Sequence, residues 1–200
     1  MSTNQQSVLS PEKMKEFWDN ALLFEDYMKV AQERAQNNPK KDDEYQEYYE
    51  LGLQRLNRTI KSFKIDEEQT EKLKATGFQG KILIISEPWC GDASATVPAV
   101  SRFFTAAGIE VKIFLRDNDL SLIDRFQTNG TQSIPKILLL NEDFSVKADW
   151  GPRPKFGNEL LKKFKENPET YPREVFYNDL QVYYSKNRGK DSIEEVISLL

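Results

Sequence analysis

The chain has 200 residues, of which 38% are hydrophobic and 30% charged, and its formal net charge is −4. This length is enough for one domain with a sizeable core, or for a domain with extensions, and the composition is that of a folded soluble protein. A mildly acidic chain has no broad electrostatic attraction for nucleic acid or anionic lipid, so we expect neither as a partner.

Two residue counts restrict the chemistry further. The sequence contains no histidine and one cysteine, Cys90. Without histidine, Ser-His-Asp and Cys-His catalysis and histidine metal sites are excluded. One thiolate with carboxylates is a poor ligand set for zinc. We therefore expect no metal and no cofactor.

The start of the chain, MSTNQQSVLS, has neither the basic nor the apolar region of a secretory signal. No apolar run approaches the roughly 20 residues of a membrane-spanning helix. A single cysteine forms no disulfide within one chain, which is usual in a reducing compartment. We expect a cytoplasmic protein that is not attached to a membrane.

The first third of the chain predicts helices. Apolar residues recur at spacings of three and four from residue 11 to residue 37, behind a capping Ser10 and a first-turn Pro11. The same pattern predicts a second helix over 42–62. A shorter third helix, over 66–76, ends at Gly77.

The middle of the chain alternates between strand and helix patterns. The run KILIIS at 81–86 is typical of a buried strand. The elements expected after it are a helix at 91–107, a strand at 109–116, a short helix at 117–129, strands at 136–140 and 145–150, a helix at 158–165 and helical stretches at 172–187 and 191–200. Parallel strands joined by helices and followed by a hairpin predict an α/β fold, with a mixed sheet and helices on both faces.

Two motifs carry a family resemblance. Trp-Cys-Gly-Asp at 89–92 lies between the strand KILIIS and a helix, and SIPKILLL at 133–140 places Pro135 directly before a later strand. The chain resembles the thioredoxin-like family, in particular its bacterial members with a helical N-terminal extension. The resemblance implies a thioredoxin-like fold. We expect an extension over 1–65, the thioredoxin-like domain over 66–170 and C-terminal helices over 171–200.

The position of Cys90 suggests a reactive thiol. At the N-terminal end of the 91–107 helix, unpaired N–H groups and the helix dipole favour a thiolate, so we interpret Cys90 as a surface nucleophile. The alternative is a small buried apolar cysteine.

Ala93 stands where a dithiol protein has its second cysteine, and a methyl group cannot attack a mixed disulfide. Ala93 is a native monothiol feature, the mark of a redox-inactive binding relative, or an engineered change that traps partners. The resemblance also implies a buried acid on the strand before the cysteine. Ile84 occupies that place, and we expect the nearby Glu87 to be exposed.

The remaining site residues follow from the resemblance. It implies a cis peptide bond at Ile134–Pro135, which would set the backbone of Ile134 beside Cys90 as a platform for an extended peptide. Trp89 would lie at the rim of the site, or else pack in the core. The expected site thus has Cys90 as the catalytic residue and, for substrate binding, Trp89, Gly91, Asp92, Ala93, Ile134 and Pro135.

The sequence leaves two functions open. The first is thiol–disulfide chemistry through Cys90 alone, by a mixed disulfide with a protein or a low-molecular-weight thiol or disulfide. The second is a redox-inactive binding module on the same fold. The chain is expected to be a monomer or a dimer. A basic group of residues is expected to be a solvated surface; its members are Arg153, Lys155, Lys162, Lys163 and Lys165.

Overall fold

A computed structural model describes residues 9–36 and 46–200. Its four-stranded sheet has the order β2-β1-β3-β4. The strands are β1 (Lys81–Ser86), β2 (Val111–Leu115), β3 (Lys136–Leu140) and β4 (Val146–Trp150). β1 pairs parallel with β2 and antiparallel with β3, and β3 pairs antiparallel with β4. The mixed sheet is thus confirmed. The expectation that the strands before the hairpin are all parallel is wrong, because β3 is antiparallel to β1 and β2.

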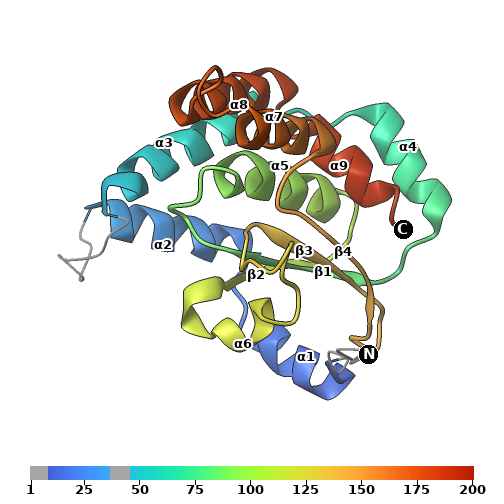
Figure 1. The fold of residues 1–200 in the computed structure, drawn as a ribbon. Helices are drawn as coiled ribbons and strands as arrows, with labels where there is room; N and C mark the ends of the chain where they lie inside the picture. Colours follow the sequence, from blue (N-terminus) through green and yellow to red (C-terminus); the bar gives the residue numbers. More distant parts are fainter. Residues whose placement is uncertain (1–8, 37–45) are drawn as a thin grey trace, which may run out of the picture.

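Helices cover both faces of this sheet (Figure 1). One face carries α5 (Ala93–Ala106), with the C-terminal helices and α3 (Gln46–Ser62) beyond it. The other face packs against α1 (Pro11–Asp19) and α6 (Leu120–Ile123). The remaining α-helices in the described part of the chain are α2 (Phe24–Gln36), α4 (Glu67–Thr76), α7 (Lys155–Glu166), α8 (Arg173–Asn187) and α9 (Lys190–Ile197). None of the helices in the described ranges is both long and apolar enough to cross a bilayer.

The single helix expected over 11–37 is wrong, because the chain breaks between α1 and α2. The backbone of Leu22 pairs with Ile113 of β2 through two N–H···O bonds of 2.8 Å. This bridge occupies the outer edge of β2, where unpaired backbone groups would otherwise face solvent. Residue 37, and residues 42–45 of the second expected helix, lie outside the described residues.

The helix expected over 117–129 is also largely wrong. Only a short 3₁₀ turn (η1, Arg116–Asn118) and one turn of α-helix, α6, form there. The Asp119 carboxylate caps α6 by accepting a hydrogen bond from the Ser121 N–H at 2.9 Å. The segment then turns at Asn129 and Gly130, both with positive φ, toward β3.

One hydrophobic core joins the N-terminal helices, the sheet and the C-terminus. Residues 82–85 of β1 are all fully buried, which explains their uninterrupted apolar run. The same cluster includes Met14 of α1, Leu56 of α3 and Ile193 of α9, each with 0% exposure. These helices therefore contribute directly to the core of the sheet. The division at residues 65 and 170 stays a prediction.

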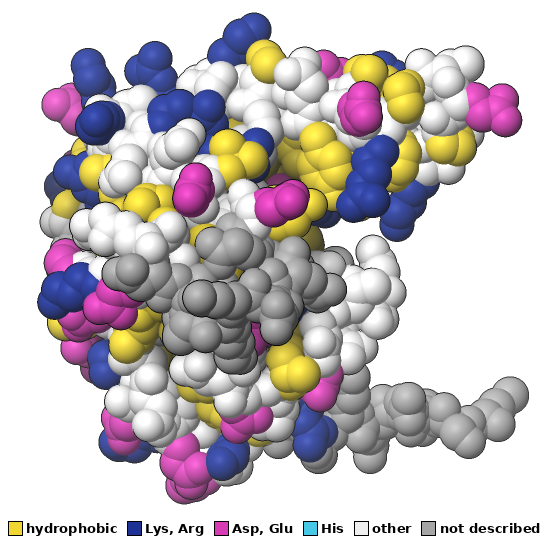
Figure 2. Space-filling view, turned by 90° about the vertical axis from the view of Figure 1, so that its left-hand side faces the viewer, with side chains coloured by type: hydrophobic (Ala, Val, Ile, Leu, Met, Phe, Trp, Pro, Cys, Tyr) yellow, Lys and Arg dark blue, Asp and Glu magenta, His cyan; other side chains and the backbone are white. Residues whose placement is uncertain are grey.

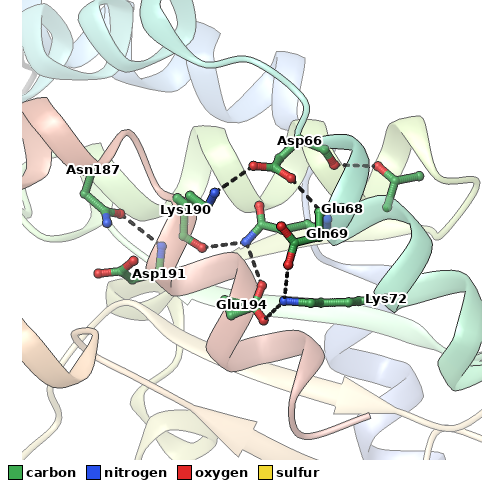
Figure 3. A network of polar contacts seen from close by, with 9 residues as sticks. Asp66, Glu68, Gln69, Lys72, Asn187, Lys190, Asp191 and Glu194 are labelled. Carbon is green, nitrogen blue, oxygen red and sulfur yellow. Dashed lines mark hydrogen bonds and ion pairs between the residues drawn. The ribbon is translucent and has the colours of Figure 1, made fainter.

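Polar contacts join the C-terminal helix α9 to α4 (Figure 3). The Gln69 amide donates hydrogen bonds to the Lys190 carbonyl at 2.9 Å and to the Glu194 carboxylate at 3.2 Å. Lys72 pairs with Glu194 at 2.6 Å and with Glu68 at 2.9 Å. Because Gln69 is buried and its amide is satisfied, this network fixes the orientation of α9 on α4.

Candidate functional site

Cys90 lies in the loop that joins β1 to α5. Its amide donates to the Glu87 carbonyl at 3.2 Å, and its own carbonyl accepts from the Ser94 N–H at 3.1 Å. The helix proper begins at Ala93, with Asp92 as the N-cap residue. The thiol donates a hydrogen bond to the carbonyl oxygen of Ile134 at 3.3 Å. The Ile134–Pro135 peptide bond is cis, and this loop stands directly against the sulfur.

The expected surface thiolate is wrong for the free protein, because Cys90 is only 8% exposed. Burial, and after it the negative charge of Asp92, raise the pKa of Cys90 to about 12. Backbone N–H groups of Asp92 and Ala93 act in the opposite direction, but they do not outweigh burial. The structure therefore holds Cys90 as a neutral thiol, which is a poor nucleophile.

A buried ion pair lies beside the thiol. Asp92 pairs with Arg153 at 2.7 Å and accepts a hydrogen bond from the Tyr184 hydroxyl at 2.7 Å. Burial nevertheless raises the pKa of Asp92 above its ordinary value, against the attraction of Arg153. Since its carboxylate is engaged by these two partners, Asp92 makes no side-chain capping bond to α5. It ties the Cys90 loop to α8 and to the segment before α7.

Glu87 is fully buried, so the expectation that it is exposed is wrong. Its carboxylate pairs with Arg34 of α2 at 2.6 Å and accepts from the Asp117 N–H at 2.9 Å. Burial raises the pKa of Glu87, while these two partners lower it. Both carboxylate oxygens are engaged away from the sulfur. Glu87 thus anchors the loop, and it has no free oxygen to take a proton from Cys90.

Cys90 forms part of the floor of a groove of about 800 Å³ between α3, α8 and the loop before β3. The β1–α5 loop lies on the left-hand side of Figure 1, and that side faces the viewer in Figure 2. There the surface is hollowed beneath a wall that carries hydrophobic and Lys/Arg side chains (Figure 2). Four arginines line the groove, namely Arg55, Arg116, Arg153 and Arg173. Its lining carboxylates are Asp92 and Glu174.

The groove brings together most of the expected site residues. Trp89, Cys90, Gly91, Asp92 and Ile134 all line it. Trp89 is half-buried at the rim, where its ring lies 4.9 Å from the Arg116 guanidinium.

Two expected residues, Ala93 and Pro135, are buried behind the groove and do not line it. They shape the floor without offering contact surface to a ligand.

Other groove residues were not identified from the sequence. Arg55 comes from α3 and Gln181 from α8, far from the WCGD motif in the chain. Arg153 belongs to the basic group that we expected to be solvated. The lysines of that group are exposed, but Arg153 is largely buried against Asp92. The only sequence signal that sets Arg153 apart is its position between Pro152 and Pro154, before the helix rather than on it.

The site offers no evident metal ligands. Within residues 9–36 and 46–200, no cluster of three acidic or cysteine side chains is placed to hold an ion. The functional groups of the groove are one thiol, four arginines, two carboxylates, amides, hydroxyls and aromatic rings.

A family model described as thioredoxin matches residues 38–165, more than half of the chain. The chain belongs to the thioredoxin family. This membership confirms the thioredoxin-like fold inferred from the WCGD and SIPK motifs. No curated protein matches the sequence.

Two solved structures have a similar fold. One is a protein of unknown function from Pseudomonas aeruginosa, with a TM-score of 0.57 and 18% identity over 92% of this chain and 95% of that one. The other is an HIV epitope-scaffold, with a TM-score of 0.56 and 17% identity over the same shares of the two chains. At these identities the two structures bear on the fold alone.

Proposed function

We propose that this thioredoxin-family protein binds a ligand non-covalently in the groove above Cys90 and does not reduce disulfides by itself. The observation that carries the proposal is the state of Cys90, a buried thiol that donates to the Ile134 carbonyl. A dithiol cycle needs a thiolate, a second thiol and a path for the proton. Here the thiol is held neutral, the second position is Ala93, and Glu87 is paired with Arg34.

Mixed-disulfide chemistry at Cys90 is the second candidate. It is favoured by the position of the sulfur on the groove floor and by the backbone N–H groups of Asp92 and Ala93, which would stabilise a thiolate. In this reaction the Cys90 thiolate attacks a ligand disulfide, one ligand sulfur leaves as a thiolate, and the mixed disulfide persists until an external thiol breaks it. A cytoplasmic location and a bacterial origin stay predictions under both candidates.

The rate of alkylation by iodoacetamide between pH 6 and pH 11, followed by mass spectrometry, separates the two functions. We expect slow alkylation at pH 7 and a rate that still rises above pH 10, because only the thiolate reacts. A mid-point near pH 7 would instead establish the monothiol reaction and reject the binding proposal.

A disulfide-reduction assay supplies the control. The protein should show no turnover with a thiol donor, and Ala93→Cys should stay near background, because a second sulfur leaves the burial of Cys90 and its neighbour Asp92 unchanged. Strong activity in Ala93→Cys would mean that Cys90 is already tuned for redox chemistry, and that Ala93 alone prevents a full cycle.

A further inference from the structure

Two of the four groove arginines form no ion pair within the described residues, and one of them, Arg55, is half-buried. The other, Arg173, is exposed and donates to the Tyr177 hydroxyl at 3.4 Å. Arg153 pairs with Asp92 at 2.7 Å, and Arg116 pairs with Asp117 at 2.7 Å. Arg55 makes neither an ion pair nor a hydrogen bond with any residue that the structure describes. It is half-buried, and the charged groups that act on it are Arg58, which repels it, and Asp92, which attracts it.

The absence of a side chain at Gly91 lets Arg55 and Gln181 pack close to the backbone of the Cys90 loop. A methyl group at Gly91 would stand 3.3 Å from Nη1 of Arg55 and 3.6 Å from Nε2 of Gln181. The guanidinium and the amide thus approach the same point, next to the Cys90 backbone. Because both groups lie close to the Gly91 backbone, a planar group bound in the groove above them can contact both.

Two further polar atoms at the floor are buried and unpaired. Nε of Arg153 and Oε1 of Gln181 have no hydrogen-bond partner within the described ranges. Buried polar atoms are nearly always paired with protein, water or ligand. Both residues line the same groove as Arg55; the Nε–H of Arg153 is a donor for a ligand oxygen, whereas Oε1 of Gln181 is an acceptor.

We propose that Arg55, with the Gln181 amide beside it, binds a carboxylate group of the ligand in the groove. This inference rests on the proposed binding function and specifies its ligand class as small carboxylate-bearing molecules. A guanidinium presents N–H groups in a planar fork that matches the two oxygens of a carboxylate. Binding also supplies the negative charge that Arg55 lacks, and it does so where solvent screening is reduced by burial.

The test measures binding of glutarate by isothermal titration calorimetry, with neutral glutaramide and inorganic phosphate as comparisons. It uses Cys90→Ser, so that thiol chemistry plays no part and failure of the redox assignment does not affect the result. We expect glutarate to bind, glutaramide not to bind and phosphate to bind more weakly. Arg55→Gln should weaken the binding of glutarate by about tenfold or more, the usual cost of a lost hydrogen bond to a charged group.

The matched control is Arg58→Gln, which removes the same charge from the next turn of α3 outside the groove. The affinity of this variant for glutarate should stay within about twofold of that of the parent protein, because an exposed charge contributes little to binding. Gly91→Ala should also weaken binding, since its methyl would press on the Arg55 guanidinium and the Gln181 amide without changing any charge. Equal losses in Arg55→Gln and Arg58→Gln, tighter binding of phosphate, or no binding of glutarate would each overturn the inference. Melting temperatures of all variants verify that they are folded.

Discussion

The thiol of Cys90 donates a hydrogen bond to the carbonyl oxygen of Ile134, across 3.3 Å and 44 positions of sequence. This contact joins the loop before α5 to the loop before β3. It satisfies the thiol in its protonated form, so the geometry and the burial act in the same direction. A cysteine in the position of a redox nucleophile is thereby held as a structural donor at the floor of a groove.

The charge of Asp92 predicts how the acidity of Cys90 can be changed. After burial, Asp92 is the largest cause of the raised pKa of Cys90. Asp92→Asn removes that negative charge and leaves the positive Arg153 nearby, so we expect the pKa of Cys90 to fall from about 12 toward its ordinary value. The pH dependence of iodoacetamide alkylation measures this fall. Asp117→Asn, which removes a carboxylate that contacts Trp89 and Arg116, should leave the profile unchanged.

The raised pKa of Cys90 also makes the stability of the folded protein depend on pH. An acid whose pKa is raised by folding keeps its proton in the folded state after the unfolded chain has lost it. Stability therefore falls as the pH rises from the unfolded value near 9 toward about 12. Because Asp92→Asn narrows this gap, the contribution of Cys90 to alkaline destabilisation should shrink. An unchanged alkylation profile in Asp92→Asn would contradict this account of the raised pKa.

The buried pair of Glu87 and Arg34 predicts a large loss of stability when the cation is removed. Arg34→Met leaves the Glu87 carboxylate fully buried without its counter-charge, which costs about 3–5 kcal/mol. The loss should be smaller in acid, because a protonated Glu87 carries no charge to compensate. Urea unfolding at pH 5 and pH 8 measures both effects. Lys13→Met, which breaks an exposed pair with Glu16, should cost less than about 1 kcal/mol.

Gly52 in α3 predicts a reversal of the usual effect of alanine in a helix. Gly→Ala in a helix generally stabilises by about 0.5–1 kcal/mol. A methyl group at Gly52, however, would collide with the backbone carbonyl of Pro88 in the Cys90 loop. We expect Gly52→Ala to lower the melting temperature and to alter the fluorescence of Trp89. Gln54→Ala, at an exposed position of the same helix, should do neither; a more stable Gly52→Ala would show that α3 does not press on the loop.

Apolar packing of α9, rather than the polar network between α9 and α4, should contribute most of the stability that this helix adds to the protein. Ile193 is fully buried, so Ile193→Ala should cost about 2–5 kcal/mol, the usual range for a core truncation. Lys72 is 44% exposed, and Lys72→Ala should cost less than about 1 kcal/mol although it removes two ion pairs. Chemical denaturation measures the free energy of unfolding of both variants. A larger loss of stability in Lys72→Ala than in Ile193→Ala would contradict this prediction.

The sequence by itself determined the family and the strands. The uninterrupted apolar run at 81–86 indicated a buried strand, and the WCGD and SIPK motifs indicated a thioredoxin-like arrangement. The identity of position 93 also followed directly, and with it the lack of a second sulfur. These features are local, because each depends on residue types that are close together in the chain.

Tertiary structure decided what the site can do. The state of Cys90 depends on burial and on Ile134, the fate of Glu87 depends on Arg34 of a distant helix, and the groove cation Arg55 comes from α3. The break between α1 and α2 likewise arises from the pairing of Leu22 with the edge of β2. Desolvation and charge pairing depend on which segments meet in space. A pattern along the chain records which groups are present, but their pKa values and partners are set only when the helices close over the sheet.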